Sequence, residues 1–251
     1  MDPLPQIIVG TYEEFVLGYK PKIKDNKVSF PQMLFIPPNP RDVKVRLYFQ
    51  DEEFKLSQIF ASHSHQASIR CIASHGRWLV SSGADEYINI YDMTTMKLSF
   101  VLNYHSATVT CLEFVPDGSY LVTAAQNGTI AIFSSCGWVL AKVWKEAHKT
   151  ANGVTSISVH PSGGLMTSTG ADNILKFWNL IKGRIAYTKN FSSKCTPGNC
   201  LNLAKWSKDG NHYAVGIGKK IEVYLTETAN VVYEIECNVK ATCLDFDVVS
   251  I

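Results

Sequence analysis

Histidine, serine and aspartate side chains recur along this chain in an order that could support nucleophilic catalysis. The most complete set is His148, Ser168 and Asp172, followed by Trp178. A serine nucleophile needs a histidine as its base and a carboxylate that orients this histidine. Two similar sets precede this one, whereas a catalytic set is needed only once. The recurrence therefore predicts a structural role, and we expect no enzyme activity.

The other two sets keep the order of the residues but change the chemistry. They are His65, Ser81, Asp85 and Tyr91, and then His105, Thr123, Asn127 and Phe133. In each set we predict a buried relay, in which the acidic or amide side chain accepts from the histidine and the histidine reaches the hydroxyl. The hydroxyl would then meet the indole N–H of Trp178, for which Tyr91 offers a phenol and Phe133 offers no donor. Asn127 carries no charge, so only the set ending in Trp178 is expected to complete the relay.

A period of roughly 40 to 45 residues separates the three sets, which is typical of the blades of a β-propeller. Each repeat divides into four short strands. They are expected at residues 109–115, 120–124, 129–133 and 139–143 in the second repeat, and at residues 154–159, 164–169, 174–178 and 184–189 in the third. Turns that begin at Pro116 and Pro161 separate strands, with proline presetting φ and glycine supplying a positive φ. The pattern predicts an all-β propeller.

The number of repeats does not make a complete ring. A degenerate fourth repeat has strands at 202–206, 213–216 and 221–225, with Tyr224 in the closing aromatic place and no histidine before it. A hairpin at residues 7–10 and 15–19, with an outer strand at 56–61, forms an amino-terminal blade. A single strand is expected at 242–248. About five blades and one strand predict one domain over residues 1–251, an incomplete seven-blade ring with unprotected edges. A closed five-blade ring with a loose tail is the alternative.

Composition limits the classes of function. The chain has 251 residues, 46% hydrophobic, with a formal net charge of +2. This balance is ordinary for a globular domain and provides no strong field for nucleic acid. The start shows no signal peptide, so we expect an intracellular protein. We expect no cofactor and no metal, because Cys195 and Cys200 have no second pair at zinc spacing. Cys71, Cys111 and Cys243 share one repeat position and are expected to be small buried residues.

Proline and lysine are dense between residues 20 and 53, where the blade pattern is interrupted. The segment contains Pro21, Pro31, Pro37, Pro38 and Pro40, and Lys20, Lys22, Lys24, Lys27 and Lys44. It predicts a Pro/Lys-rich loop inserted in the first blade, and loops of this length are usually functional or disordered. We expect partner binding around Lys22, Lys24, Lys27 and Arg41. A solvated, flexible insert remains the alternative.

The repeats resemble WD-repeat propellers over residues 56–225, and three segments narrow the resemblance. These are residues 7–19, residues 88–93, and residues 160–163 together with 177–190. In them the chain is similar to the Pak-interacting protein family, the animal relatives of the yeast maintenance-of-killer WD-repeat protein. The Pro/Lys-rich insert and the missing last blades with their basic tail depart from that family.

The resemblance implies a function without catalysis. The family is implicated in the assembly of the large ribosomal subunit, so a scaffold in the nucleus and nucleolus that serves pre-rRNA processing is expected. Its partners would be pre-ribosomal assembly factors, with RNA contact within the particle. Animal members are also described as negative regulators of Pak kinases, so a signalling adaptor that binds a Pak-type kinase is the alternative.

Overall fold

The computed structural model describes residues 7–10, 15–22, 55–149 and 153–246 of the chain. These residues form strands and turns in five antiparallel sheets. The described ranges contain no helix, so no helix within them could cross a membrane. The all-β class predicted from the sequence is therefore confirmed.

Each of the last four sheets has four strands in chain order, and the first has three. The first sheet contains β1 (Ile7–Gly10), β2 (Phe15–Lys22) and β3 (Lys55–His63). The second contains β4 (Ile69–His75), β5 (Trp78–Gly83), β6 (Tyr87–Asp92) and β7 (Lys97–Asn103). The third contains β8 (Val109–Phe114), β9 (Tyr120–Ala125), β10 (Ile130–Ser134) and β11 (Val139–Trp144). The fourth contains β12 (Val154–Val159), β13 (Leu165–Gly170), β14 (Ile174–Asn179) and β15 (Arg184–Asn190). The fifth contains β16 (Leu201–Trp206), β17 (His212–Ile217), β18 (Lys220–Leu225) and β19 (Val231–Glu236).

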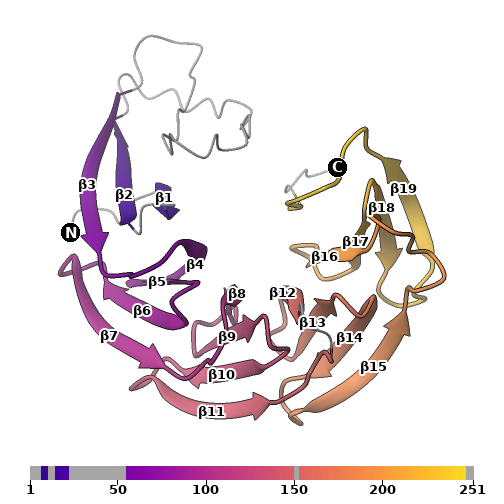
Figure 1. Cartoon of the computed structure of the whole chain (residues 1–251), viewed down its shortest axis with the longest axis horizontal. Helices are drawn as coiled ribbons and strands as arrows, with labels where there is room; N and C mark the ends of the chain where they lie inside the picture. The colour runs from indigo at the N-terminus through magenta and orange to yellow at the C-terminus, as the bar shows by residue number, and fades with distance from the viewer. Residues whose placement is uncertain (1–6, 11–14, 23–54, 150–152, 247–251) are drawn as a thin grey trace.

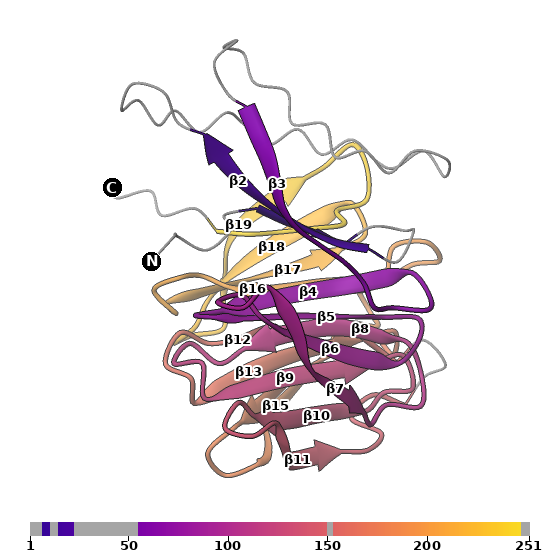
Figure 2. The same cartoon turned by 90° about the vertical axis from the view of Figure 1, so that its left-hand side faces the viewer.

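The sheets stand side by side in an open arc (Figure 1). The first strands β4, β8, β12 and β16 line the inside of the arc, and the fourth strands β7, β11, β15 and β19 form its outside. In the side view β4, β5 and β6 lie one beneath another, while β7 crosses them at an angle (Figure 2). Such a rotation between neighbouring strands is the normal twist of a sheet. The arrangement is that of an incomplete propeller, as the repeats predicted.

Burial changes from strand to strand across each sheet, which shows where the sheets pack on one another. The second strands β5, β9 and β13 are almost entirely buried, whereas the outer strands β7, β11 and β15 are largely exposed. One apolar cluster joins the third and fourth sheets and includes Ile132, Ile157, Met166 and Trp178. Such clusters lie between neighbouring sheets, so each blade depends on the next one for part of its core.

A bulge recurs where the third strand meets the outer strand. The register shifts between Ile90 and Tyr91 in the second sheet, and between Phe177 and Trp178 in the fourth. The third and fifth sheets shift immediately before Phe133 and Tyr224. A bulge re-aims the side chain beside it. The closing aromatic residue of every four-stranded sheet is thus set at one repeated backbone irregularity.

Two predictions near the end of the chain were wrong. Residues 241–246 form no strand, although 242–248 was expected to be one, and residues 247–251 lie outside the described ranges. The Ala241 N–H donates to the Gly218 carbonyl, but no ladder follows, because a strand pattern needs a partner strand. Cys243 is consequently exposed, while Cys71 and Cys111 are partly buried. Strand β19 was not predicted.

The expected insert begins later than the sequence suggested. Lys20, Pro21 and Lys22 belong to β2, where Pro21 pairs with Leu56 and Lys22 with Lys55. Residues 23–53, which make up the rest of the expected loop, lie outside the described residues.

Candidate functional site

The histidines of the relays and their acidic or amide partners lie at one edge of the propeller, because antiparallel strands place alternate connections at opposite ends of each sheet. The loops that enter β8, β12 and β16 share this edge with the turns between second and third strands. We call it the relay edge. His148 lies in the loop before β12, and Asp172 lies in the turn between β13 and β14. Ser168 is on β13 and Trp178 is on β14.

The fourth sheet holds a complete relay. His148 Nδ1 lies 3.0 and 3.1 Å from the two carboxylate oxygens of Asp172, and His148 Nε2 lies 2.8 Å from Ser168 Oγ. The indole Nε1–H of Trp178 donates to Ser168 Oγ over 2.8 Å. His148, Ser168 and Trp178 are at most 2% exposed. All four residues are therefore joined in one buried chain of hydrogen bonds.

The charge on Asp172 sets the direction of these hydrogen bonds. Burial raises the pKa of the carboxyl group, but the hydrogen bond and charge of His148 lower it, as do the backbone N–H groups of Ile174 and Lys149. The pKa of Asp172 lies below its ordinary value as a result, and an ionised carboxylate only accepts. His148 Nδ1–H therefore donates to Asp172, and in the neutral imidazole Nε2 accepts from the hydroxyl of Ser168.

The second sheet repeats this arrangement with a phenol in place of the indole. His65 Nδ1 lies 2.7 Å from Asp85 Oδ2, and His65 Nε2 lies 2.7 Å from Ser81 Oγ. Ser81 Oγ and the phenol oxygen of Tyr91 lie 3.4 Å apart. The set thus reaches its aromatic residue, through a contact longer than the 2.8 Å indole bond of the fourth sheet. At this distance an O–H···O bond is weak.

The relay of the third sheet is incomplete, because its histidine contacts the hydroxyl residue but no carboxylate or amide. His105 Nε2 lies 2.8 Å from Thr123 Oγ1, whereas His105 Nδ1 is buried without a partner. Asn127 turns outward instead, and its amide donates to Ser106 Oγ over 3.3 Å. With no carboxylate nearby, burial lowers the pKa of His105 to about 4. Phe133 is buried and has no donor to add.

A different cluster occupies the relay edge of the fifth sheet. Lys194 Nζ lies 2.9 and 2.7 Å from the two carboxylate oxygens of Glu222, and the phenol of Tyr224 donates to the same carboxylate. Lys220 Nζ lies 3.4 Å from Glu222 and 2.9 Å from Glu234. Glu222 is 1% exposed. A buried carboxylate with three donors has thus replaced the histidine relay.

The electrostatics of this cluster follow from its donors. Burial raises the pKa of Glu222, but hydrogen bonds from Lys194 and Tyr224 and the charge of Lys194 bring it below its ordinary value. Burial and the hydrogen bond to Glu222 raise the pKa of Tyr224. Lys189 lies 3.9 Å above the Tyr224 ring, and burial and the charge of Lys194 lower its pKa.

The register of the sheets identifies where Glu222 comes from. It pairs with Val215, at the place where Ser168 pairs with Lys176 in the fourth sheet. Lys176 donates to the Ala147 carbonyl over 2.5 Å, just before the relay histidine. The fifth sheet thus has Val215 at the position of Ser168 and Glu222 at the position of Lys176. The ionic cluster therefore occupies the same place in its sheet as the relay does in the fourth.

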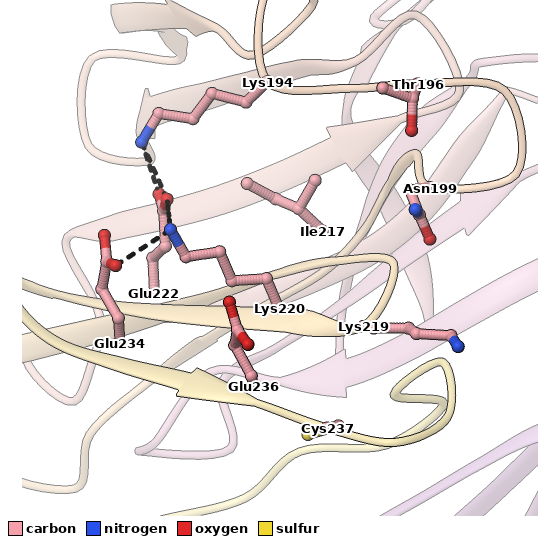
Figure 3. A pocket seen from close by; sticks show the side chains of 10 residues that line it. All are labelled: Lys194, Thr196, Asn199, Ile217, Lys219, Lys220, Glu222, Glu234, Glu236 and Cys237. Atoms are coloured by element: carbon pink, nitrogen blue, oxygen red, sulfur yellow. Dashed lines mark hydrogen bonds and ion pairs between the residues drawn. The ribbon is translucent and has the colours of Figure 1, made fainter.

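A cleft of about 570 Å³ opens beside this cluster. The residues lining it include Lys194, Asn199, Lys219, Lys220, Glu222 and Glu236. Lys194 and Lys220 approach Glu222 from the β15–β16 loop and from β18, while Lys219 extends away from them (Figure 3). Among the described residues, Lys219 and Glu236 form no ion pair. The cleft therefore offers charges of both signs, a chemistry suited to polar side chains of a protein partner.

The three relays have little scope for catalysis. Their histidines are between 1% and 4% exposed, and the hydroxyl groups beside them are fully buried. A nucleophile must reach the atom it attacks, so these side chains have no access to a substrate. The arrangement can instead hold loops to strands, because a satisfied buried network stiffens its surroundings.

The structure separates the predicted sites into two groups. The relay residues of the second and fourth sheets are brought together, and Asn127 is left apart from its histidine. Lys22 ends strand β2, and Lys24, Lys27 and Arg41 lie outside the described residues. The sequence reasoning missed Lys194 and Glu222. One signal in the sequence was available: the fourth repeat has no histidine at the relay position, so a different polar group had to occupy that place.

Comparison with known proteins supports the interpretation of the repeats. The family model described as WD domain, G-beta repeat, matches residues 54–92, 96–134 and 139–179. The chain is a WD-repeat protein. Each matched segment contains the outer strand of one sheet and the first three strands of the next, as in β3 to β6. The WD repeat in this chain therefore links two blades covalently.

Relatives of this WD-repeat chain carry names from two groups. It is 32% identical over 241 residues to the p21-activated protein kinase-interacting protein 1-like of Danio rerio, covering 96% of this chain and 56% of that one. It is 32% identical to the human p21-activated protein kinase-interacting protein 1, over 90% of this chain and 50% of that one. It is 28% identical to Protein MAK11 of Saccharomyces cerevisiae, over 92% and 53%. The resemblance seen in the sequence is confirmed, and the chain spans about half the length of the curated relatives it matches.

Proposed function

We propose that this WD-repeat chain is a non-catalytic scaffold for assembly of the large ribosomal subunit in the nucleolus, acting in pre-rRNA processing. The observation that carries the scaffold role is the burial of the repeated relays, whose polar groups are used to hold the blades. The ribosomal role rests on the family resemblance, and the similarity to Protein MAK11 supports it. Its partners are pre-ribosomal assembly factors, with RNA contact inside the particle.

Two surfaces are offered to such partners. The first is the charged cleft beside Glu222 on the relay edge. The second is the Pro/Lys-rich segment with Lys22, Lys24, Lys27 and Arg41, whose positive charge suits RNA phosphates. A scaffold that joins protein and RNA in one particle needs surfaces of both kinds.

Affinity purification of the tagged 251-residue chain from nuclear extract, followed by mass spectrometry, tests this proposal. Large-subunit assembly factors should accompany the chain, and replacing Lys22, Lys24, Lys27 and Arg41 by serine should reduce their recovery. A matched control replaces the exposed lysines Lys97, Lys145, Lys208 and Lys240 by serine. Recovery of other proteins without assembly factors would contradict the ribosomal role.

Binding of a Pak-type kinase is the second candidate function. The names of the zebrafish and human relatives favour it, since both are called kinase-interacting proteins. In this case the chain would act as a signalling adaptor and negative regulator. An isolated kinase domain should then bind with little dependence on salt, whereas RNA contact weakens steeply as salt increases. A salt titration of both interactions therefore distinguishes the two functions.

A further inference from the structure

A second concave surface lies on the edge opposite the relays, between the third and fourth sheets. It is a groove of about 690 Å³ surrounded by the β8–β9, β12–β13 and β14–β15 turns. Val115 and Ile132, each 7% exposed, and the partly buried Leu180 provide its apolar lining. No relay residue contributes to it. Charged residues are fewer in its lining than in that of the cleft beside Glu222.

The groove is preformed by fixed turns. Gly163, with φ +71°, lies so close that a Cβ atom there would be 3.1 Å from Val115 Cγ1. Asn179 Oδ1 accepts from the Lys182 N–H over 2.7 Å, and the indole of Trp144 donates to the Gly183 carbonyl over 3.1 Å. Both ends of the β14–β15 turn are thereby held. A partner would not have to order these turns, which reduces the entropic cost of binding.

The side chain at the tip of the β14–β15 turn is unusual for its position. Ile181 is 86% exposed, more than any other large hydrophobic side chain of the described residues. Tyr120, 41% exposed, lies on another wall of the same groove. Turn tips normally carry polar residues. An exposed isoleucine next to an apolar groove indicates a surface that a partner covers.

Charges on the rim indicate the chemistry of that partner. Lys142 and Lys182 both line the groove, and in the part of the chain that the structure describes neither is paired with a carboxylate. The carboxylate of Asp117, the acidic residue among those that line the groove, accepts from the backbone N–H and the hydroxyl of Ser119 over 2.9 and 2.6 Å. The two lysines are therefore the cations available to an incoming acidic group.

We propose that this groove binds a short extended peptide segment of a partner protein, with a large apolar side chain in the groove and acidic side chains against Lys142 and Lys182. A second copy of the chain fits less well, because a twofold dimer would bring the two basic rims together. Nucleic acid also fits less well, because only two cations line the groove and the Asp117 carboxylate lies beside them, which is unfavourable for a phosphate backbone. The proposal goes beyond the scaffold role and uses a different edge of the propeller.

An array of nine-residue peptides, probed with the labelled full chain, tests the proposal. The peptides vary the central pair between Leu-Phe and Ser-Ser, and the flanking residues between acidic and basic. Peptides with an apolar centre and acidic flanks should be retained at least about tenfold better than the other classes. Equal retention of all classes, or a preference for basic flanks, would overturn the proposal.

Two variants locate the binding on the chain. Ile181→Asp should reduce retention about tenfold, whereas Ile235→Asp on β19, also an exposed isoleucine, should have no effect. The double variant Lys142→Glu and Lys182→Glu should invert the preference, so that peptides with basic flanks are retained. Thermal melts check that each variant is folded. A preference that stays acidic in the double variant, or a dimer in sedimentation that Ile181→Asp dissociates, would refute the peptide as occupant.

Discussion

Replacing Asp172 by alanine should destabilise the chain far more than replacing Asn127, although both occupy the same position of a repeat. Asp172→Ala leaves the Nδ1–H of His148 buried without an acceptor and removes the hydrogen bond from the Ile174 N–H. An orphaned buried donor costs about 1–3 kcal/mol, and a lost hydrogen bond adds about 0.5–1.5 kcal/mol. The free energy of unfolding should therefore fall by about 2–4 kcal/mol.

Asn127→Ala removes much less. The Asn127 side chain is exposed and contacts the hydroxyl of Ser106 and the N–H of Thr129, both of which water can replace. We expect a loss of at most about 1 kcal/mol. Because His105 does not contact Asn127, its environment stays unchanged.

Thermal melts followed by circular dichroism measure the difference. The two losses differ by about 1–4 kcal/mol, and for a domain of this size 1 kcal/mol shifts Tm by about 2–4 °C, so Asp172→Ala should melt about 2–16 °C below Asn127→Ala. Asp172→Asn serves as a control, since its amide oxygen still accepts from His148 and should recover part of the loss. Equal melting temperatures for the two alanine variants would refute the account of the relay.

The pH dependence of stability gives an independent check on the role of the Asp172 charge. The folded pKa of Asp172 is lowered, so its contribution to stability is present above the ordinary carboxyl pKa of about 3.9 and is lost as the pH falls below it. The gap between the wild-type chain and Asp172→Ala should therefore close at acid pH. A gap that is constant down to about pH 3 would contradict the role of the charge.

Three further predictions concern the other sites. Asn127→Asp offers a carboxylate to His105, so the His105 pKa, about 4 in the native chain, should rise and Tm should increase by about 2–4 °C; an unchanged histidine titration by NMR would contradict it. Glu222→Ala leaves Lys194 and the phenol of Tyr224 without their carboxylate, while Lys220 keeps Glu234, and should lower the free energy of unfolding by about 2–4 kcal/mol, less than for a fully buried pair because Lys194 reaches solvent; a urea midpoint like that of the native chain would refute this. Cys136 is exposed and should react with a thiol reagent well before Cys111, whose thiol pKa burial raises to about 11; equal rates would show that Cys111 is accessible.

The arrangement of the relays shows why a catalytic interpretation of His148, Ser168 and Asp172 fails. The three side chains have the distances of a nucleophile, a base and an orienting carboxylate, but Ser168 also accepts from Trp178 and is fully buried. A stabilising network and a catalytic one can use the same residue types. Access to solvent decides between them.

Local features of the chain were sufficient to predict most of the fold. Strand length, the position of Pro116 and Pro161 in turns, and the spacing from His148 to Trp178 all depend on contacts within one repeat. Such contacts recur with the period of the sequence, so the repeats themselves reveal them. Strand β19 was not predicted, although the outer strands β11 and β15, which are also largely exposed, were.

By itself, the sequence determined the propeller class, the order of the strands and the chemistry of the relay in the fourth sheet. Only the tertiary structure decided that Asn127 turns away from His105, that Glu222 takes Lys194 and Lys220 as partners, and that residues 241–246 form no strand. It also decided that Ile181 borders a groove. The physical reason is that periodicity and turn chemistry are properties of neighbouring residues. Side-chain direction, strand pairing and concave surfaces depend instead on groups that only the packing of separate blades brings together.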